Sequence, residues 1–260
     1  MSSDRALAAA LWCARQQGGA VAKDAADGID GTDQAYAVQR ESWSLAGMAR
    51  GGWKVGATSA FAQERLGLIA PAIAPMWAPE FAESPTAFAM PADQHTSVES
   101  EFAFRFGSGL PARAEPYAMD EVLDAVEAVL PAIEIVGCRF EGGFVGLGAE
   151  RLISDLVANK AWVHGPSHAD WRGRDFKDHA VSLTRNGETI AEGTGSAALG
   201  DPFNVLKWTA DTLSAMGEGL AAGEVVTTGT CTGIEPVSPG DVMVADFGDL
   251  GSVEIRFEAA

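Results

Sequence analysis

The sequence has few cysteines and little positive charge. Its three cysteines, Cys13, Cys138 and Cys231, include no CxxC pair. A sparse and odd set of this kind argues against a disulfide framework and predicts reduced thiols in a cytoplasmic protein. The 36 acidic residues outnumber the 18 lysines and arginines and leave a net charge of −18. Because an acidic surface repels phosphate backbones, we expect no nucleic-acid partner.

Histidines and long apolar runs are also scarce. The four histidines show no HExxH-type spacing, so we expect any metal to be bound through oxygen. No run approaches the roughly 18 apolar residues of a membrane span, and the N-terminal stretch lacks the Lys/Arg-led start of a signal peptide. We therefore expect no membrane partner. The hydrophobic fraction of 47% is sufficient for a large core.

The N-terminal third is predicted to be helical and then irregular. Residues 6–17 and 32–49 lack proline and carry apolar residues at helical intervals. Residues 70–93 are rich in proline, which excludes a long helix or a central strand and predicts a loop or an edge segment. We expect a mainly helical portion at 1–75 and a second portion at 76–260, which can also form one continuous domain.

The remainder is predicted to alternate strands with two helices. Residues 98–106 alternate with period two, as in a strand with one buried aromatic face. Residues 119–130 have the pattern of an amphipathic helix. Further expected elements are a short strand at 132–136, a hairpin around Asn186-Gly187, a helix at 202–216, and strands at 225–228, 242–246 and 252–257. This order lacks a βαβ repeat and indicates an α+β fold with a mixed β core.

Three glutamates are candidate metal ligands. Glu99 and Glu101 are two residues apart on the predicted strand, so both lie on the face opposite the phenylalanines. Their repulsion would be relieved by a cation, although such a pair can also lie on an exposed face. Glu134 lies in the apolar segment PAIEIV, where an unpaired carboxylate is costly to bury. It either completes a three-carboxylate site suited to Mg²⁺ or Mn²⁺, or pairs with Arg139 or Lys54.

Two further segments contain residues that can take part in catalysis or binding. Lys54 lies between Trp53 and Val55 in GGWKVGATS, where burial would lower its pKa toward the range of an acid–base catalyst. An ordinary lysine with an exposed amine is the alternative. Gly229-Thr230 ends a predicted strand in a glycine-flanked turn whose N–H groups and hydroxyl can hold a carboxylate, unless it is a plain β-turn.

These segments, taken together, resemble the 2-keto-4-pentenoate hydratase and 4-oxalocrotonate decarboxylase group of the fumarylacetoacetate hydrolase superfamily. The resemblance covers roughly residues 35–258. The segments that carry it are GGWKVGATS, RLGL at 65–68, VESEFAFRF, LPAIEIVGCRF at 130–140, GTGSAALGDPFNVLKWTA at 193–210, and AGEVVTTGTCTG with the later VSPGD and DFGDLGSV.

The resemblance implies a mixed β-roll or sandwich with outer helices, with residues 76–260 as the catalytic β-roll domain. It also implies a bound Mg²⁺ or Mn²⁺ and a homo-oligomer. It places the metal on Glu99, Glu101 and Glu134 and proton transfer on Lys54. Asp155 matches the aspartate of an ADNAS-type segment and is expected to be catalytic. The residues expected to contact the substrate are Thr58, Ser59, Gly229 and Thr230.

The implied reaction is hydration of a 2-hydroxy-2,4-dienoate to a 4-hydroxy-2-oxo acid in the catabolism of aromatic compounds. Leu156 and Ala158 replace the asparagine and serine of the ADNAS-type segment. Decarboxylation of a 4-oxalocrotonate-like acid, hydrolysis of an acylpyruvate, and a catalytically weak binding or scaffold role therefore remain alternatives. The first 90 residues lack histidine, which argues against hydrolysis. The residues expected to favour a short or hydrophobic substrate tail are Trp53, Phe61, Met76, Trp77 and Phe144.

Overall fold

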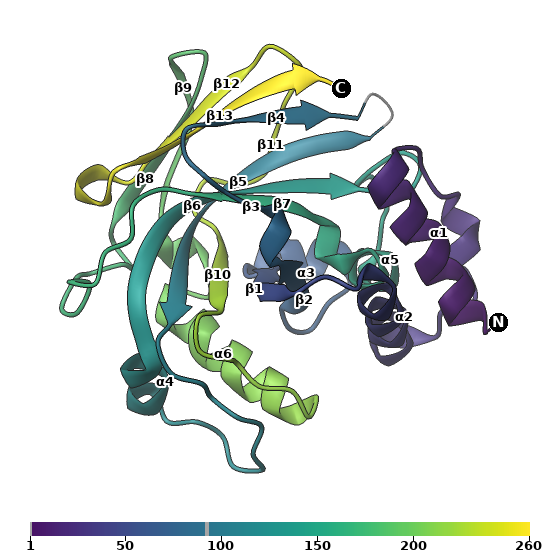
Figure 1. Cartoon of the computed structure of the whole chain (residues 1–260), viewed down its shortest axis with the longest axis horizontal. Helices are drawn as coiled ribbons and strands as arrows, with labels where there is room; N and C mark the ends of the chain where they lie inside the picture. Colours follow the sequence, from purple (N-terminus) through teal and green to yellow (C-terminus); the bar gives the residue numbers. More distant parts are fainter. Residues whose placement is uncertain (1, 92–93) are drawn as a thin grey trace.

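The computed structural model describes residues 2–91 and 94–260, which form two curved β-sheets with helices outside them (Figure 1). The eight-stranded sheet has the order β2 (Ala72–Trp77), β1 (Arg50–Gly56), β10 (Val225–Thr230), β5 (His95–Phe106), β6 (Val126–Cys138), β7 (Asn159–His164) and β3 (Phe81–Glu83), with β11 (Glu235–Pro236) paired to β5. The five-stranded sheet has the order β4 (Thr86–Met90), β13 (Ser252–Ala259), β12 (Val242–Asp246), β8 (Ala180–Arg185) and β9 (Glu188–Thr194).

Both parallel and antiparallel strand pairs occur in these sheets. The pairs β1–β10, β3–β7 and β4–β13 are parallel, whereas β5–β6 and β8–β9 are antiparallel. The hairpin β8–β9 turns at Asn186-Gly187, and both residues have positive φ, at 53° and 86°. These observations confirm the α+β class and the mixed β core.

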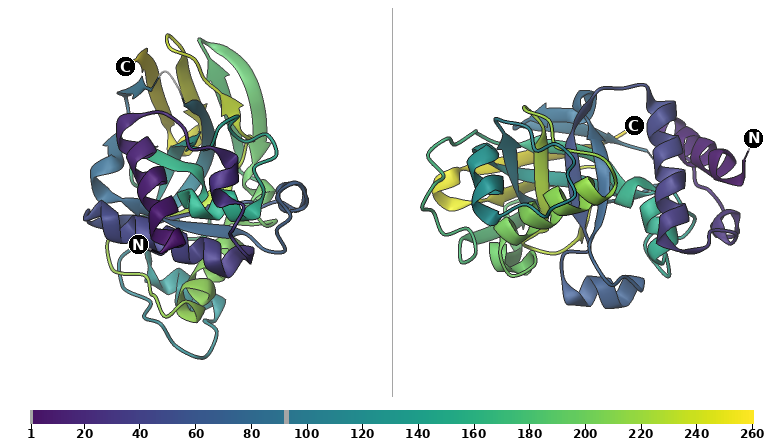
Figure 2. Two further views of the ribbon diagram at one scale, coloured as in Figure 1. Left: turned by 90° about the vertical axis from the view of Figure 1, so that its right-hand side faces the viewer. Right: turned by 90° about the horizontal axis from the view of Figure 1, so that it is seen from below.

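Helices cover the outside of the sheets. They are α1 (Ser3–Gln17), α2 (Gly31–Ala46), α3 (Ala60–Leu66), α4 (Met119–Ala125), α5 (Ala149–Ser154) and α6 (Pro202–Ala215), with single 3₁₀ turns at Lys23–Ala26, Ala78–Glu80, Leu156–Ala158, Gly195–Ala197 and Gly248–Leu250. Figure 2 shows α1 and α2 packed together at one end and α3 set apart from the sheets. Among the described residues, no helix is both long and apolar enough to cross a membrane.

The first two helices match their prediction closely. The second ends at Ala46 instead of residue 49, because Gly47 adopts a left-handed conformation that closes the helix. The proline-rich segment forms β2, β3 and β4, and each of these is an edge strand of its sheet. This agrees with the prediction of an edge segment, because proline lacks the backbone N–H that a central strand needs to pair with strands on both sides.

The helix predicted at 119–130 was too long. α4 ends at Ala125, and β6 begins at Val126 and continues through Pro131 to Cys138. Within Val126 to Leu130, four residues pair with Ala103 to Phe106 of β5, so tertiary pairing outweighs their helical spacing. Pro131 is tolerated within the strand because β7 pairs with β6 only from Ala132 onward.

The division of the chain at residue 75 stays a prediction. β1 and β2 lie inside the range predicted to be helical, and β1 pairs with β10 from the other end of the chain. The large sheet therefore takes strands from both portions.

An aromatic core joins the two sheets through one face of β5. The ring centroid of Phe102 lies 5.3 Å from that of Phe176 and 5.3 Å from that of Phe247, which follows β12 of the smaller sheet. Because side chains alternate along a strand, the opposite face of β5 carries Glu99 and Glu101. The core thus sets which way the two acids point.

A buried ion pair holds a strained turn beside β6. Leu156, Val157 and Ala158 have φ of 56°, 51° and 58°, a left-handed run that is unfavourable for residues other than glycine. The Arg139 side chain bridges the two ends of this run. Its Nε donates to Asp155 Oδ1 at 2.6 Å, and its Nη1 donates to the backbone O of Asn159 at 2.8 Å. Arg139 and Asp155 are each only 1% exposed.

Replacing Arg139 by methionine is expected to lower the free energy of unfolding by about 3–5 kcal/mol, because Asp155 would be left buried without its partner. Urea denaturation followed by tryptophan fluorescence measures the change. Arg174→Met is the control, since it breaks an exposed ion pair with Asp249 and should leave the midpoint nearly unchanged. Equal midpoints for the two variants would contradict the structural role of Arg139.

Candidate metal centre

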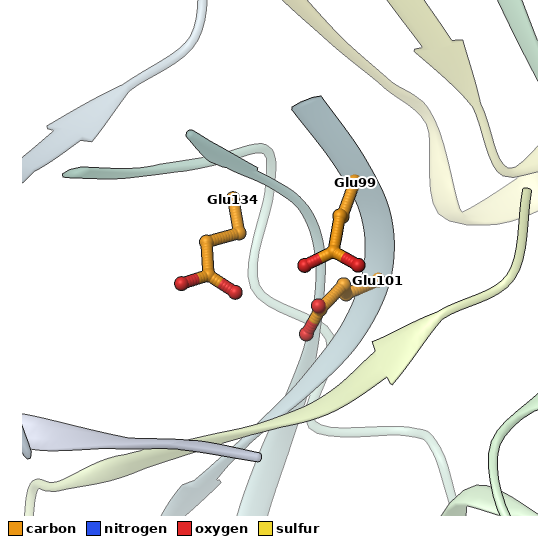
Figure 3. A group of neighbouring side chains, drawn as sticks. All are labelled: Glu99, Glu101 and Glu134. Carbon is orange, nitrogen blue, oxygen red and sulfur yellow. The ribbon is translucent and has the colours of Figure 1, made fainter. Parts of the chain in front are cut away.

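The three predicted acids meet on the face of the large sheet opposite the aromatic core. Glu99 of β5 is the direct cross-strand partner of Glu134 of β6, and Glu101 lies two residues further along β5. Oxygen atoms from all three lie within 4.8 Å of one another, and Figure 3 shows the carboxylates converging from the two strands. Glu99 is 8% exposed, whereas Glu101 and Glu134 are fully buried.

Lys54 reaches the same cluster from β1. Its Nζ lies 2.9 Å from Glu134 Oε2 and 3.7 Å from Glu99 Oε2, and the residue is 2% exposed. The pairing of Glu134 with Lys54, one of the alternatives drawn from the sequence, is therefore present. It does not balance the site, because one ammonium group faces three carboxylates.

The surplus of acids shifts the pKa values in this cluster. Burial raises the pKa of Glu99 to about 7, although Lys54 opposes the shift, and burial with the charges of Glu134 and Glu99 raises the pKa of Glu101 well above its usual range. The prediction of a lowered pKa for Lys54 was wrong. Burial does favour loss of its proton, but the attraction of the three glutamates outweighs burial and raises the pKa.

The polar atoms around the acids leave places for a cation. Glu101 Oε2 accepts a hydrogen bond from the backbone N–H of Gly229 at 3.0 Å, but Glu101 Oε1 is buried without a hydrogen-bond partner. Glu134 Oε1 accepts from Asn159 Nδ2 at 2.8 Å. Three carboxylates with an unsatisfied oxygen are the ligand set that Mg²⁺ and Mn²⁺ prefer. The residues therefore fit a divalent cation.

A pocket of about 580 Å³ opens from this cluster. Lys54 and Glu99 are the members of the cluster that line it. The four residues predicted to contact the substrate, Thr58, Ser59, Gly229 and Thr230, all line it. Its apolar lining includes Phe61, Leu66, Phe144, Val157 and Ile234. Phe61 and Phe144 were among the predicted tail-binding residues, whereas Trp53, Met76 and Trp77 are buried elsewhere in the core.

The turn at Gly229-Thr230 does not offer the groups predicted from the sequence. The N–H of Gly229 donates to Glu101, and the hydroxyl of Thr230 donates to the backbone O of Gly233 at 2.8 Å. Both groups therefore already form hydrogen bonds within the protein, and these bonds stabilise Glu101 and the turn. Gly229 has a φ of 90°, and a Cβ there would lie 2.1 Å from Thr58 Oγ1, so both conformation and space require glycine.

Asp155 is not brought to the pocket. Its carboxylate accepts from the backbone N of Arg139 at 2.8 Å and from Arg139 Nε at 2.6 Å, and no contact with Lys54 is present among the described residues. The expected catalytic role of Asp155 is thus not supported by its position and stays a prediction. Instead, Val157 and Ala158 from the neighbouring turn line the pocket.

One residue of the site had no signal in the sequence. Asn159 donates to Glu134, yet it lies at the first position of a strand that the sequence analysis did not identify. Its role depends on the pairing of β7 with β6, which brings the two strands together.

Comparisons with known proteins agree with this geometry. The sequence pattern of the family described as fumarylacetoacetate (FAA) hydrolase, C-terminal, matches residues 69–258. A 2-keto-4-pentenoate hydratase of Paraburkholderia xenovorans is 33% identical over 232 residues, 87% of this chain and 84% of the relative. A 4-oxalocrotonate decarboxylase of a Pseudomonas species is 29% identical over 163 residues, 63% of this chain and 60% of the relative. The solved 4-oxalocrotonate decarboxylase of Pseudomonas putida G7, complexed with magnesium and adipate, superposes with a TM-score of 0.88 at 25% identity, covering 98% of this chain and 97% of that one.

The raised pKa of Glu99 predicts that metal affinity depends on pH. In the metal-free protein this carboxyl keeps its proton up to pH about 7, above the ordinary value of 4.5, so its contribution to stability is present below pH 4.5 and is lost as the pH rises through 7. A cation requires the ionised form. Affinity for Mg²⁺ should therefore be at least roughly tenfold lower at pH 6 than at pH 8, and the raised pKa of Glu101 adds to this dependence in the same direction. Isothermal titration calorimetry measures it, and an affinity that stays constant or falls over this range would contradict the account.

Proposed function

The chain belongs to the fumarylacetoacetate hydrolase family, and we propose that it is a divalent-metal-dependent hydratase that adds water to a 2-hydroxy-2,4-dienoate. The observation that carries the proposal is the cluster of Glu99, Glu101, Glu134 and Lys54, of which Lys54 and Glu99 line a pocket with a largely apolar lining. The 33% identical relative named as a 2-keto-4-pentenoate hydratase supports it. The proposed role is in the catabolism of aromatic compounds, in a cytoplasmic homo-oligomer.

The three glutamates would hold Mg²⁺ or Mn²⁺, which would act as a Lewis acid toward the negative charge on the carboxylate and 2-oxygen of the substrate. The protein buries these acids largely away from water, and charges interact more strongly in such a low-dielectric environment. We expect the hydroxyl of Thr58, which lines the pocket and is largely buried, to contact the substrate.

Lys54 is the proposed proton donor. Hydration requires a proton on the far carbon of the dienol, followed by attack of water at C4, which gives a 4-hydroxy-2-oxo acid. The raised pKa of Lys54 keeps Nζ protonated, and Lys54 both contacts the acids and lines the pocket. Neutralisation of the glutamates by a bound cation would remove the attraction that holds this proton and make its transfer easier.

Decarboxylation of a 4-oxalocrotonate-like acid is a second candidate, favoured by one feature of the pocket. Arg65, an exposed residue of α3, lines the pocket, and no ion pair involves it among the described residues. Its guanidinium is suited to a second carboxylate at the far end of a substrate. The remaining outer wall, which includes Phe61, Phe144 and Ile234, is apolar and favours the hydratase, whose substrate tail carries no charge.

Purified protein with Mg²⁺ is expected to consume the dienol absorbance of 2-hydroxypenta-2,4-dienoate and to form 4-hydroxy-2-oxopentanoate, identified by mass spectrometry. Removal of the metal with EDTA should abolish turnover. Lys54→Met should lower kcat about 10²–10⁴-fold, because the proton donor is lost. Lys177→Met, a change at an exposed lysine outside the pocket, is the control and should retain the rate.

The same assay separates the candidates. Release of CO₂ from 4-oxalocrotonate, with no change in the dienol beyond the buffer rate, would reject the hydratase in favour of the decarboxylase. Loss of neither substrate would reject both activities.

A further inference from the structure

Asn159 connects the first helix of the chain to a metal-ligand candidate. Its Nδ2 donates to Glu134 Oε1 at 2.8 Å, and Arg15 Nη2 donates to its Oδ1 at 3.2 Å. Arg15 belongs to α1, outside the matched family segment 69–258, yet its side chain is only 4% exposed. The contact therefore extends the site beyond the β-sheet that carries the acids.

The two partners of Asn159 leave its amide only one orientation. A guanidinium can only donate hydrogen bonds, and an ionised carboxylate can only accept them. A flipped amide would set Oδ1 against Glu134 and the NH₂ group against Arg15, and both hydrogen bonds would be lost. Arg15 thus determines which end of the Asn159 amide faces Glu134.

Further contacts hold the Asn159 backbone and the Arg15 side chain in place. The backbone O of Asn159 accepts from Arg139 Nη1 at 2.8 Å and also from Arg15 Nη1. Arg15 is held in turn by an ion pair with Glu80 and by the ring of Trp77, whose centroid lies 5.0 Å from its guanidinium carbon. Such a buried and saturated arrangement leaves Arg15 little freedom to move.

We propose that Arg15 and Asn159 are positioning residues for the metal centre. Arg15 orients the Asn159 amide. Asn159 donates to Oε1 of Glu134 and thereby fixes the rotation of this carboxylate, so that Oε2 faces Lys54. The inference rests on the metal site of the proposed function. Groups that hydrogen-bond a ligating side chain typically change metal affinity 10–100-fold.

The test is a double-mutant cycle read by Mn²⁺ affinity. The dissociation constant for Mn²⁺ is measured by electron paramagnetic resonance on substrate-free protein at pH 8, for the wild type, Arg15→Gln, Asn159→Ala and the double variant. Each single change should raise the constant about tenfold. The double variant should bind no more weakly than the weaker single variant, because both changes break the same chain of hydrogen bonds. A hundredfold, additive loss in the double variant, or an unchanged constant in Arg15→Gln, would overturn the proposal.

Arg50→Gln is the matched control. Arg50 also stacks on two tryptophans, Trp43 and Trp53, at 4.9 and 4.5 Å, and pairs with the largely buried Glu224, but it bonds to none of the three acids. Arg50→Gln should lower the melting temperature, as we also expect for Arg15→Gln, but should leave the dissociation constant for Mn²⁺ unchanged. An equal loss of Mn²⁺ affinity in Arg50→Gln would show general destabilisation and reject the positioning role.

Two further measurements keep the outcome decisive. If Arg15→Gln does not fold, Arg15→Lys replaces it. That change retains the charge with a single donor group, and its constant should lie between those of the wild type and Asn159→Ala; a constant equal to that of the wild type would reject the role of the guanidinium. A wild-type protein that binds Mn²⁺ but does not hydrate the dienol would reject the proposed function alone.

Discussion

The surplus of negative charge in one buried cluster is the constraint on which the rest of the structure depends. Oxygen atoms of Glu99, Glu101 and Glu134 lie within 4.8 Å of one another, and Lys54 is in contact with Glu99 and Glu134. Such a cluster is unfavourable without a further positive charge, which is reflected in the raised pKa values of Glu99 and Glu101. The proposed metal centre would explain why the fold retains these acids in its interior.

Much of the surrounding structure holds these acids in place. The aromatic core packs on the other face of β5 and turns Glu99 and Glu101 toward Glu134. The N–H of Gly229 fixes Glu101, while the Asn159 amide fixes Glu134. Asn159 follows a left-handed turn that is costly for residues other than glycine and is held by the buried Arg139–Asp155 pair. The strained turn and the ion pair therefore serve the same site.

The parts of this arrangement that depend on local periodicity were predictable from the sequence. Alternation along residues 98–106 placed Glu99 and Glu101 on one face, and the apolar neighbours of Glu134 showed that it needed a partner. The parts that depend on strand pairing were not predictable. The spacing of apolar residues in 126–130 suits a helix, but these residues form a strand because they pair with β5. Asp155 matched a family motif, yet its position beside Arg139 follows from packing that no local pattern encodes. Asn159 and Arg15 are 144 residues apart, so only the fold shows that they meet.

The central claim is that the three glutamates bind one divalent cation, and the most direct measurement is diffraction at the manganese absorption edge from crystals grown with Mn²⁺. The account predicts one strong anomalous peak between the carboxylates of Glu99, Glu101 and Glu134, at the base of the pocket. Absence of a peak there, with Lys54 still in contact with Glu134, would contradict it.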